Sequence, residues 1–473
     1  MATKTRVIID TDPGVDDITA ILLALASPEI EILAFIITFG NTDIDHAYDN
    51  IRKLFQALTI HFEKHPDQRA RFPGYTLVSE ANSKGFTDQV PFLAKGEQRP
   101  LDGEMYTAKY FHGRDGLSDV STRHPELNIQ NSSAWSNFSN GPDPRLPYRP
   151  TQIHGPQLTL NLLKQHPSEN ITYIAMGPLT SLAKACEMDR DLVRTRIGRV
   201  LVMGGAVDVP GNTSPVAEFN WFADPFAVHN LLIAAISEAT LTAEDDGSSG
   251  KREDITGLLP LEKFLMFPLD ITKEHALPFD AYKKLVDPGF ADAPSQEKDK
   301  SWLVHFTSSY LERVKEVMAQ YNSKNAMELH DILPVWYAIT HPWPPAKHQS
   351  HAPPPFAKSR LSNGWKVTAR RFEIERTGSL TRGMLIVDRR SFTSSQSKGH
   401  NRAYEQTKTD LAEAPDPVGA QSASDAKKLA ASTGSTAANE HPGDEGGVLC
   451  ATGTPGDDVL VKLLFERIWG IDT

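Results

Sequence analysis

The chain has 473 residues, 40% of them hydrophobic and 23% charged, and 60 acidic against 49 basic side chains give a formal net charge of −11. This composition is typical of a globular protein with a large core, and the acidic excess argues against a surface that binds nucleic acid or an anionic membrane. With 2 cysteines, no leader-like apolar segment and no apolar run near the roughly 20 residues of a membrane span, we expect a cytoplasmic protein without a disulfide framework.

The first two predicted elements, a strand at 7–9 and a helix that includes 18–25, enclose an acidic loop. The strand is β-branched, Pro13-Gly14 permits a sharp turn, and apolar residues then recur at helical spacing. Four carboxylates fall within eight residues: Asp10, Asp12, Asp16 and Asp17. Asp16 or Asp17 can cap the helix, so one interpretation of the loop is a capped turn whose other acids are solvated. Because like charges this close repel, the loop instead predicts a metal site at the carboxyl end of the strand, where α/β sheets bind ligands.

Strands and helices continue to alternate and indicate a three-layer α/β fold, in which helices flank a mostly parallel, open, Rossmann-like central sheet. The next strand is predicted at 30–38 and the next helix at about 46–58. Further expected elements are a strand, a turn and a helix start across 171–180, strands at 199–203, 264–269, 367–375 and 383–388, helices at about 302–320, 331–339 and 457–469, and ordered chain again at 448–451. The last two strands are candidates for an antiparallel pair.

We expect one α/β domain over residues 1–473, interrupted by polar loop insertions. Three shorter insertions are expected. The one at about 128–151 is rich in Asn, Ser and Pro, the one at 241–256 in charged and small residues, and the one at 343–356 in Pro and His. The longest, 393–447, contains few large apolar side chains and cannot bury enough surface to offset the entropy of ordering. It is therefore predicted to be a disordered insertion before the C-terminal helix.

Three later clusters could carry chemistry. Glu218 and Asn220 stand on alternate positions, which would point the same way on an extended segment, and a carboxylate with an amide suits sugar hydroxyls. The pair His330-Asp331 and the glycine-bracketed His112 are further candidates. Taken alone, the segment with Glu218 and Asn220 could be an ordinary polar loop, His330-Asp331 a capped helix start, and the segment around His112 a simple turn.

Together these motifs resemble those of the inosine–uridine-preferring nucleoside hydrolase family. Residues 10–17 match the family's opening pattern Asp-x-Asp-x-Gly-x-Asp-Asp in full. The remaining motifs follow in the family's order: Gly40-Asn41, Gly-Pro-Leu-Thr at 177–180, Met-Gly-Gly at 203–205, Glu-Phe-Asn at 218–220 and His330-Asp331. The resemblance covers about 1–60, 90–120, 155–340 and 365–390, and the terminal helix.

The resemblance implies a Ca²⁺-dependent N-glycosyl hydrolase that cleaves ribonucleosides to ribose and free base. It implies that Asp12, as general base, activates a calcium-bound water and that His330 faces the leaving base. The implied metal ligands are Asp12, Asp17, the backbone carbonyl of Met176 and Asp331, with Asp10 in support. The implied ribonucleoside contacts are Asp16 and Asn41 at the 2′ and 3′ hydroxyls, Asn212, Glu218 and Asn220 on the 5′ side, and His112 at the base. A homo-oligomer, dimer or tetramer, is implied as well.

Several alternatives stay open at this point. A catalytically weak nucleoside-binding protein would share the fold. A haloacid-dehalogenase-type phosphatase would explain the Asp10-Thr11-Asp12 spacing but not the second doublet, Asp16-Asp17. The preferred base (uridine, inosine, another purine nucleoside or nicotinamide riboside) is not determined, although an aromatic residue within 310–321 is a candidate for the base pocket.

Overall fold

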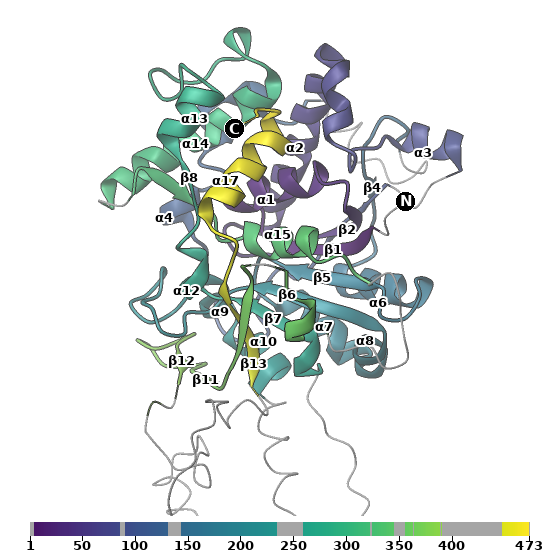
Figure 1. Cartoon of the computed structure of the whole chain (residues 1–473), viewed down its shortest axis with the longest axis vertical. Coiled ribbons are helices and arrows are strands. Elements are labelled where there is room, and N and C mark those ends of the chain that lie inside the picture. Colours follow the sequence, from purple (N-terminus) through teal and green to yellow (C-terminus); the bar gives the residue numbers. More distant parts are fainter. Residues whose placement is uncertain are drawn as a thin grey trace, which may run out of the picture. The chain divides into compact units, whose positions relative to one another are not determined.

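A nine-stranded sheet runs through the described part of the chain (Figure 1). The computed structural model describes residues 4–85, 90–130, 143–233, 259–321, 324–344, 355–362, 364–387, 389 and 447–472. The strand order is β10-β13-β7-β6-β5-β1-β2-β3-β4, and only β10 is antiparallel to its neighbour. The strands are β1 Thr5–Thr11, β2 Ile30–Ile37, β3 Phe92–Lys95, β4 Arg149–Pro150, β5 Ile171–Ala175, β6 Ile197–Met203, β7 Phe264–Phe267, β10 Lys366–Arg370 and β13 Val448–Gly453.

Helices cover both faces of the sheet. In β1, Val7 and Ile9 pack in one core with α1, α2, α14, α15 and α17, whereas Ile8 packs in a second core with α6, α7, α8 and α10, because successive side chains of a strand point to opposite faces. These helices are α1 Val15–Leu25, α2 Ile44–Lys64, α6 Gly155–Gln165, α7 Thr180–Met188, α8 Arg190–Arg196, α10 Pro225–Val228, α14 Trp302–Gln320, α15 Ile332–Thr340 and α17 Asp457–Leu464. The predicted three-layer α/β fold is confirmed.

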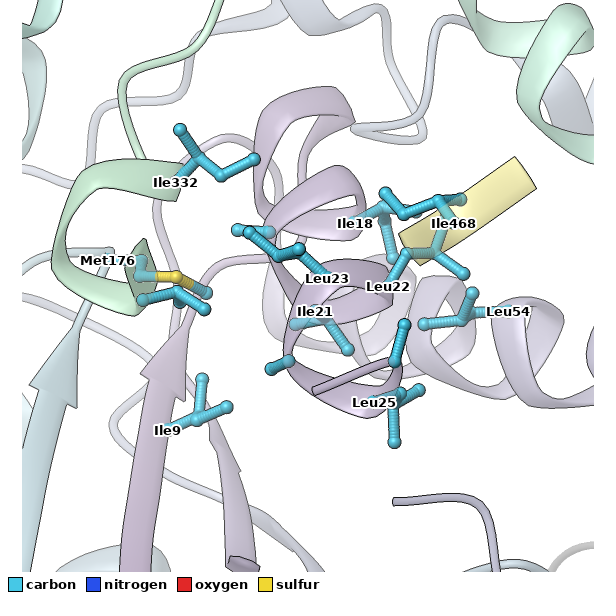
Figure 2. Close-up of a cluster of buried hydrophobic side chains, with 14 of the residues drawn as sticks. Ile9, Ile18, Ile21, Leu22, Leu23, Leu25, Leu54, Met176, Ile332 and Ile468 are labelled. Carbon is cyan, nitrogen blue, oxygen red and sulfur yellow. The ribbon is translucent and has the colours of Figure 1, made fainter. Parts of the chain in front are cut away.

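Helix α1 is buried along its whole length and connects the core to the acidic loop (Figure 2). Its apolar residues face β1 on one side and the last turns of the chain on the other, where Ile468 lies beside Leu22. The side chain of Met176, at the end of β5, belongs to the same cluster. This packing holds the start of α1 and the end of β5 in fixed positions.

We expect Ile21→Ala to lower the free energy of unfolding by about 2–5 kcal/mol, because it removes three carbons from a fully buried position. Chemical denaturation followed by circular dichroism measures the loss. Val459→Ala, on a half-exposed position of α17, is the control and should cost less than about 0.5 kcal/mol. Equal losses in the two variants would contradict the core assignment.

The long elements lie close to their predicted positions. The strand expected at 7–9 is part of β1, the strand expected at 30–38 is β2, which ends one residue earlier, and the helix expected at 302–320 is α14. The strand expected at 264–269 stops at Phe267, because Pro268 has no amide hydrogen for the ladder and the chain turns into α12 (Leu269–Thr272).

Two predictions at the sheet edges need correction. The end of the expected insertion at 128–151 is part of the sheet: it forms β4, and Leu146 and Tyr148 beside it are buried. The single late strand expected at 367–375 is two strands. Its first part is β10, which pairs with β13, and its second part, β11 (Glu373–Ile374), forms the antiparallel pair with β12 (Leu385–Ile386).

Residues 1–387 and 446–473 form one compact unit and 388–445 a second. Nearly all of the second unit, including most of the expected insertion 393–447, lies outside the described residues, as do the insertion at 241–256 and most of that at 343–356. Their structural character and the single-domain organisation stay predictions. Within the described residues, no helix combines the length and the apolar character that crossing a bilayer requires.

Candidate active site

The acidic loop lies where β1 ends and α1 begins. Gly14 is the N-cap residue of α1, and its amide donates to Oδ2 of Asp17 over 2.9 Å, while the Thr11 hydroxyl donates to Oδ1 of Asp17 over 2.5 Å. Asp17 is therefore the acid that caps the helix, and it is fully buried. These bonds direct its carboxylate to the carboxyl end of the sheet, as the loop pattern predicts.

Three carboxylates converge at this edge. One oxygen each of Asp16, Asp17 and Asp331 lies within 4.8 Å of the others, and all three side chains are buried. Asp331 is the N-cap residue of α15 but its side chain makes no capping hydrogen bond, so its carboxylate is free to join the other two. Burial, followed by the charges of its neighbours, raises the pKa of Asp331 well above its usual range and that of Asp16 to about 6. A cation among them would stabilise the charged forms.

Asp12 lies against this cluster without lining the pocket. It is fully buried, and its Oδ2 accepts a hydrogen bond of 2.7 Å from the amide of Asn41. Its Oδ1 finds no hydrogen-bond partner among the described residues. Burial and then the charge of Asp17 raise the pKa of Asp12 well above its usual range. A buried carboxylate oxygen without a donor is the arrangement expected of a ligand or a proton acceptor.

Two glycines leave room for the Asp12 carboxylate. A Cβ built on Gly177 would lie 2.7 Å from Oδ1 of Asp12, and one built on Gly40 would lie still closer to Oδ2. Real side-chain carbons do not approach so closely. The glycines of the Gly-Asn and Gly-Pro motifs after β2 and β5 are therefore required sterically by Asp12, which follows β1 directly.

We expect Gly177→Ala to displace Asp12 and to lower by about 10-fold or more both the calcium affinity and the turnover that the family resemblance implies, while secondary structure is kept. Calcium titration and a ribose-release assay measure the two effects. Gly289→Ala is the matched control, because the nearest atom to its new methyl group is 3.7 Å away. A Gly177→Ala variant that behaves like this control would contradict the proposed tight fit.

Asp10 is hydrogen-bonded to the neighbouring strand of the sheet. Its Oδ2 accepts a 2.7 Å hydrogen bond from the hydroxyl of Tyr173 on β5, and burial raises the pKa of Asp10 to about 8. Asp10 does not line the pocket. Its predicted supporting role at the metal site stays a prediction.

A pocket opens over the cluster at the carboxyl ends of the central strands. Its lining residues are Asp16, Asn41, Ala108, Tyr110, Phe111, His112, Met176, Met203, Asn212, Glu218, Phe219, Asn220, Glu328, His330 and Asp331. Every residue predicted to contact the ribonucleoside is in this set, together with Met176 and His330. Of the predicted metal and catalytic residues, Asp10, Asp12 and Asp17 lie behind the lining.

Glu218 and Asn220 are not on an extended segment, so that prediction is wrong. Glu218 is the N-cap residue of α9 (Phe219–Ala223), and its carboxylate accepts from the amides of Gly205, Asn220 and Trp221 over 2.7–3.1 Å. The side-chain amide of Asn220 donates to the Met176 carbonyl over 2.8 Å. The two residues thus connect the ends of β5 and β6, and both still line the pocket.

His112 contributes a neutral imidazole to the wall. Its Nδ1 accepts from the amide of Val15 over 3.3 Å, which places the ring proton on Nε2. Burial lowers the pKa of His112 to about 3. The side chain can therefore donate one hydrogen bond but does not become charged near neutral pH.

His330 is held by a residue that sequence reasoning missed. Its Nδ1 lies 2.8 Å from the Thr272 hydroxyl and its Nε2 3.3 Å from Oε2 of Glu328. Burial acts to lower the pKa of His330, but the hydrogen bond that the ring donates to Glu328 and the charges of nearby acids outweigh it, so the pKa is raised. Glu328 stands two residues before His330 at the end of the short strand β9 (Ala326–Glu328), and this alternation was the available signal.

The aromatic residues of the pocket come from another segment than expected. Tyr110, Phe111 and Phe219 line it, whereas the stretch 310–321 is part of α14 and does not. Tyr310 is buried, and its hydroxyl lies 3.0 Å from that of Thr19 on α1. The expectation that an aromatic residue from 310–321 lines the base pocket is therefore wrong.

Comparison with known proteins gives a consistent result. Residues 7–68 and 75–413 match the family described as "Inosine-uridine preferring nucleoside hydrolase". The Leishmania major protein of that name is 31% identical over 291 residues, which are 60% of this chain and 76% of the relative. "Probable uridine nucleosidase 2" of Arabidopsis thaliana is 31% identical over 224 residues, 47% of this chain and 54% of the relative. A solved plant nucleoside hydrolase shares the fold, with a TM-score of 0.56 and 19% identity over 98% of both chains.

The matches to the curated relatives cover only part of those proteins. The chain spans about half the length of most curated relatives it matches. The named activities belong to those proteins.

Proposed function

Because the chain belongs to the inosine-uridine preferring nucleoside hydrolase family, we propose that it hydrolyses the N-glycosidic bond of ribonucleosides to ribose and free base. The observation that carries this proposal is the convergence of Asp16, Asp17 and Asp331 at the base of a pocket, with the unbonded oxygen of Asp12 beside them. The family match leaves the phosphatase alternative without support. A binding protein without turnover is the remaining alternative.

The chemistry of the acidic cluster fits Ca²⁺. The donors are carboxylate oxygens, with the Met176 carbonyl at the same pocket, and Ca²⁺ prefers six to eight such oxygens. Asp17, Asp331 and Asp12 would hold it, and the geometry adds Asp16, which the resemblance assigns to the sugar. When bound, the ion supplies positive charge that neutralises the cluster and makes a nearby water more acidic.

Asp12 would act as the general base. Its Oδ1 takes the proton of the attacking water as the new bond to C1′ of the ribose forms. The bond between C1′ and the base nitrogen breaks with its electron pair on the base, and the remaining carboxylates stabilise the positive charge that develops on the sugar ring. A carboxyl group whose burial raises its pKa is a stronger base than a solvated one, which suits this task.

The other side chains would position the substrate. Asp16, a member of the acidic cluster, and Asn41, which donates to Asp17, fit the 2′ and 3′ hydroxyls. Asn212, which accepts from the Phe219 amide, and Asn220 line the pocket beside Glu218. His330 would give a proton or a hydrogen bond to the leaving base, with Glu328 holding the ring in place. His112, which carries its proton on Nε2, is a second donor for the base.

A ribose-release assay on uridine, inosine, adenosine, cytidine and nicotinamide riboside tests the proposal, with Ca²⁺ and after chelation. We expect release from at least one nucleoside that chelation abolishes and added Ca²⁺ restores. Nucleoside binding without release, in protein shown to contain Ca²⁺, would favour the binding-protein alternative instead. The same panel determines the preferred base, and sedimentation of the purified protein tests the expected dimer or tetramer. The cytoplasmic location stays a prediction.

A further inference from the structure

A second group of metal-binding side chains lies outside the acidic cluster. His124, Glu126 and His305 each offer one ligand atom, and these atoms lie within 4.8 Å of one another. His124 and Glu126 are at the start of the short helix η3 (Pro125–Leu127), and His305 is in the first turn of α14. Both histidines are buried, whereas Glu126 is partly exposed, so the group can be reached from solvent.

The spacing of the three ligand atoms suits a small tetrahedral ion. Nδ1 of His124 and Nε2 of His305 lie 3.3 and 3.0 Å from the same oxygen, Oε1 of Glu126. With metal–ligand distances of about 2.0–2.2 Å, neighbouring ligands of a tetrahedral ion lie about 3.3 Å apart. Small side-chain movements would therefore admit the ion.

The outer nitrogen of each ring faces a group of the kind that metal-bound histidines use. Nδ1 of His305 lies 3.0 Å from the Ser295 hydroxyl, and Nε2 of His124 lies 3.6 Å from Oε2 of Glu312. A ring hydrogen directed at a hydroxyl or carboxylate leaves the inner nitrogen with a free lone pair. Both rings would thus present a lone pair to the point that Glu126 faces.

Hydrogen bonding within the group does not satisfy His124. Its ring lies between two carboxylates, Glu126 at 3.3 Å from Nδ1 and Glu312 at 3.6 Å from Nε2, and the second distance is too long for a hydrogen bond. Consistent with this, Nε2 of His124 and Oε1 of Glu312 are buried without a hydrogen-bond partner among the described residues. A metal ion bound at Nδ1 would leave the ring hydrogen on Nε2, where it faces Glu312.

We propose that His124, Glu126 and His305 bind one Zn²⁺ ion, with its fourth position open to water. Two imidazoles and one carboxylate favour a borderline metal such as zinc, whereas the all-oxygen cluster of the proposed active site favours Ca²⁺. The two sites therefore select different ions in one chain.

The zinc site would connect a pocket wall to α14. The segment 112–126 begins with His112, which lines the pocket, and already contacts α14 where Arg123 donates to the carbonyl of Ser309 over 2.9 Å. Helix α14 in turn contacts α1 through Tyr310 and Thr19. An ion between His124 and His305 would add to the contacts between the same two elements, a structural rather than a catalytic role.

Zinc titration of the full, chelator-stripped chain tests this proposal. Free Ca²⁺ is kept in large excess so that it competes for the acidic cluster, and a chromophoric chelator reports bound zinc. We expect one Zn²⁺ per chain in the wild-type protein and in Asp331→Ala, and at least about 100-fold weaker binding in Glu126→Gln. Because Glu126 is partly exposed, its variant should fold as the wild type does.

His46→Gln is the matched control, since His46 is half-exposed and contacts a single carboxylate, that of Asp43. It should bind zinc as the wild type does. Zinc should also raise the unfolding temperature of the wild type and the control but not of Glu126→Gln. Wild-type protein that takes up no zinc, or a Glu126→Gln variant that binds it equally well, would overturn the proposal and leave a cluster held by hydrogen bonds alone. None of these readouts depends on nucleoside hydrolysis.

Discussion

Replacing Asp12 by asparagine is expected to reduce kcat for ribose release by about 10²–10⁴-fold, the usual contribution of a general base. The substitution keeps the shape of the side chain and an oxygen that can accept from the Asn41 amide, but it removes the proton acceptor. A ribose-release assay at saturating nucleoside measures kcat. Asp67→Asn, at an exposed position outside the pocket, is the control and should leave kcat unchanged.

The same variant should not be less stable than the wild type in the absence of calcium. Burial and the charges of neighbouring aspartates disfavour the ionised form of Asp12, so a neutral amide removes a repulsive contact. Thermal unfolding in chelator checks this second expectation. Loss of turnover accompanied by loss of the calcium-free fold would point to a structural role, and retained turnover would contradict the catalytic one.

The first half of the site could be predicted because its signals are local. Residues 10–17 contain the strand end, the turn, the cap and the acids within one short segment, and the structure keeps them in that order. The pocket lining likewise includes the predicted residues that follow other strands, such as Asn41 and Asn220. Parallel strands bring their carboxyl ends to one edge, so motifs far apart in the sequence could be placed together.

The parts that were missed depend on tertiary contacts. β4 is two residues long and joins the sheet only because β3 lies beside it, so no local periodicity marks it. Glu218 was expected on an extended segment. Instead, its carboxylate accepts hydrogen bonds from three backbone amides, and the residue stands at the start of a helix. Glu328 has no motif of its own, and its importance follows from its contact with His330.

Replacing Asp331 by alanine is expected to abolish most of the stabilisation that calcium gives. A ligand present at 100 times its dissociation constant stabilises the folded state by about 2.7 kcal/mol, and losing one of the converging carboxylates removes most of that gain. Thermal unfolding with and without Ca²⁺ measures the difference. Wild-type protein should show a clear calcium-dependent rise in Tm and the variant little or none.

Asp17→Ala separates ion binding from folding. Asp17 accepts hydrogen bonds from Thr11, Gly14 and Asn41, so its loss should lower Tm even in chelator. Asp331 makes no capping bond, so its loss should change the calcium-free Tm much less. If both acids hold the ion, the two variants lose the calcium response alike and differ only in the calcium-free state. An undiminished calcium response in Asp331→Ala would place the ion elsewhere and withdraw Asp331 from the site.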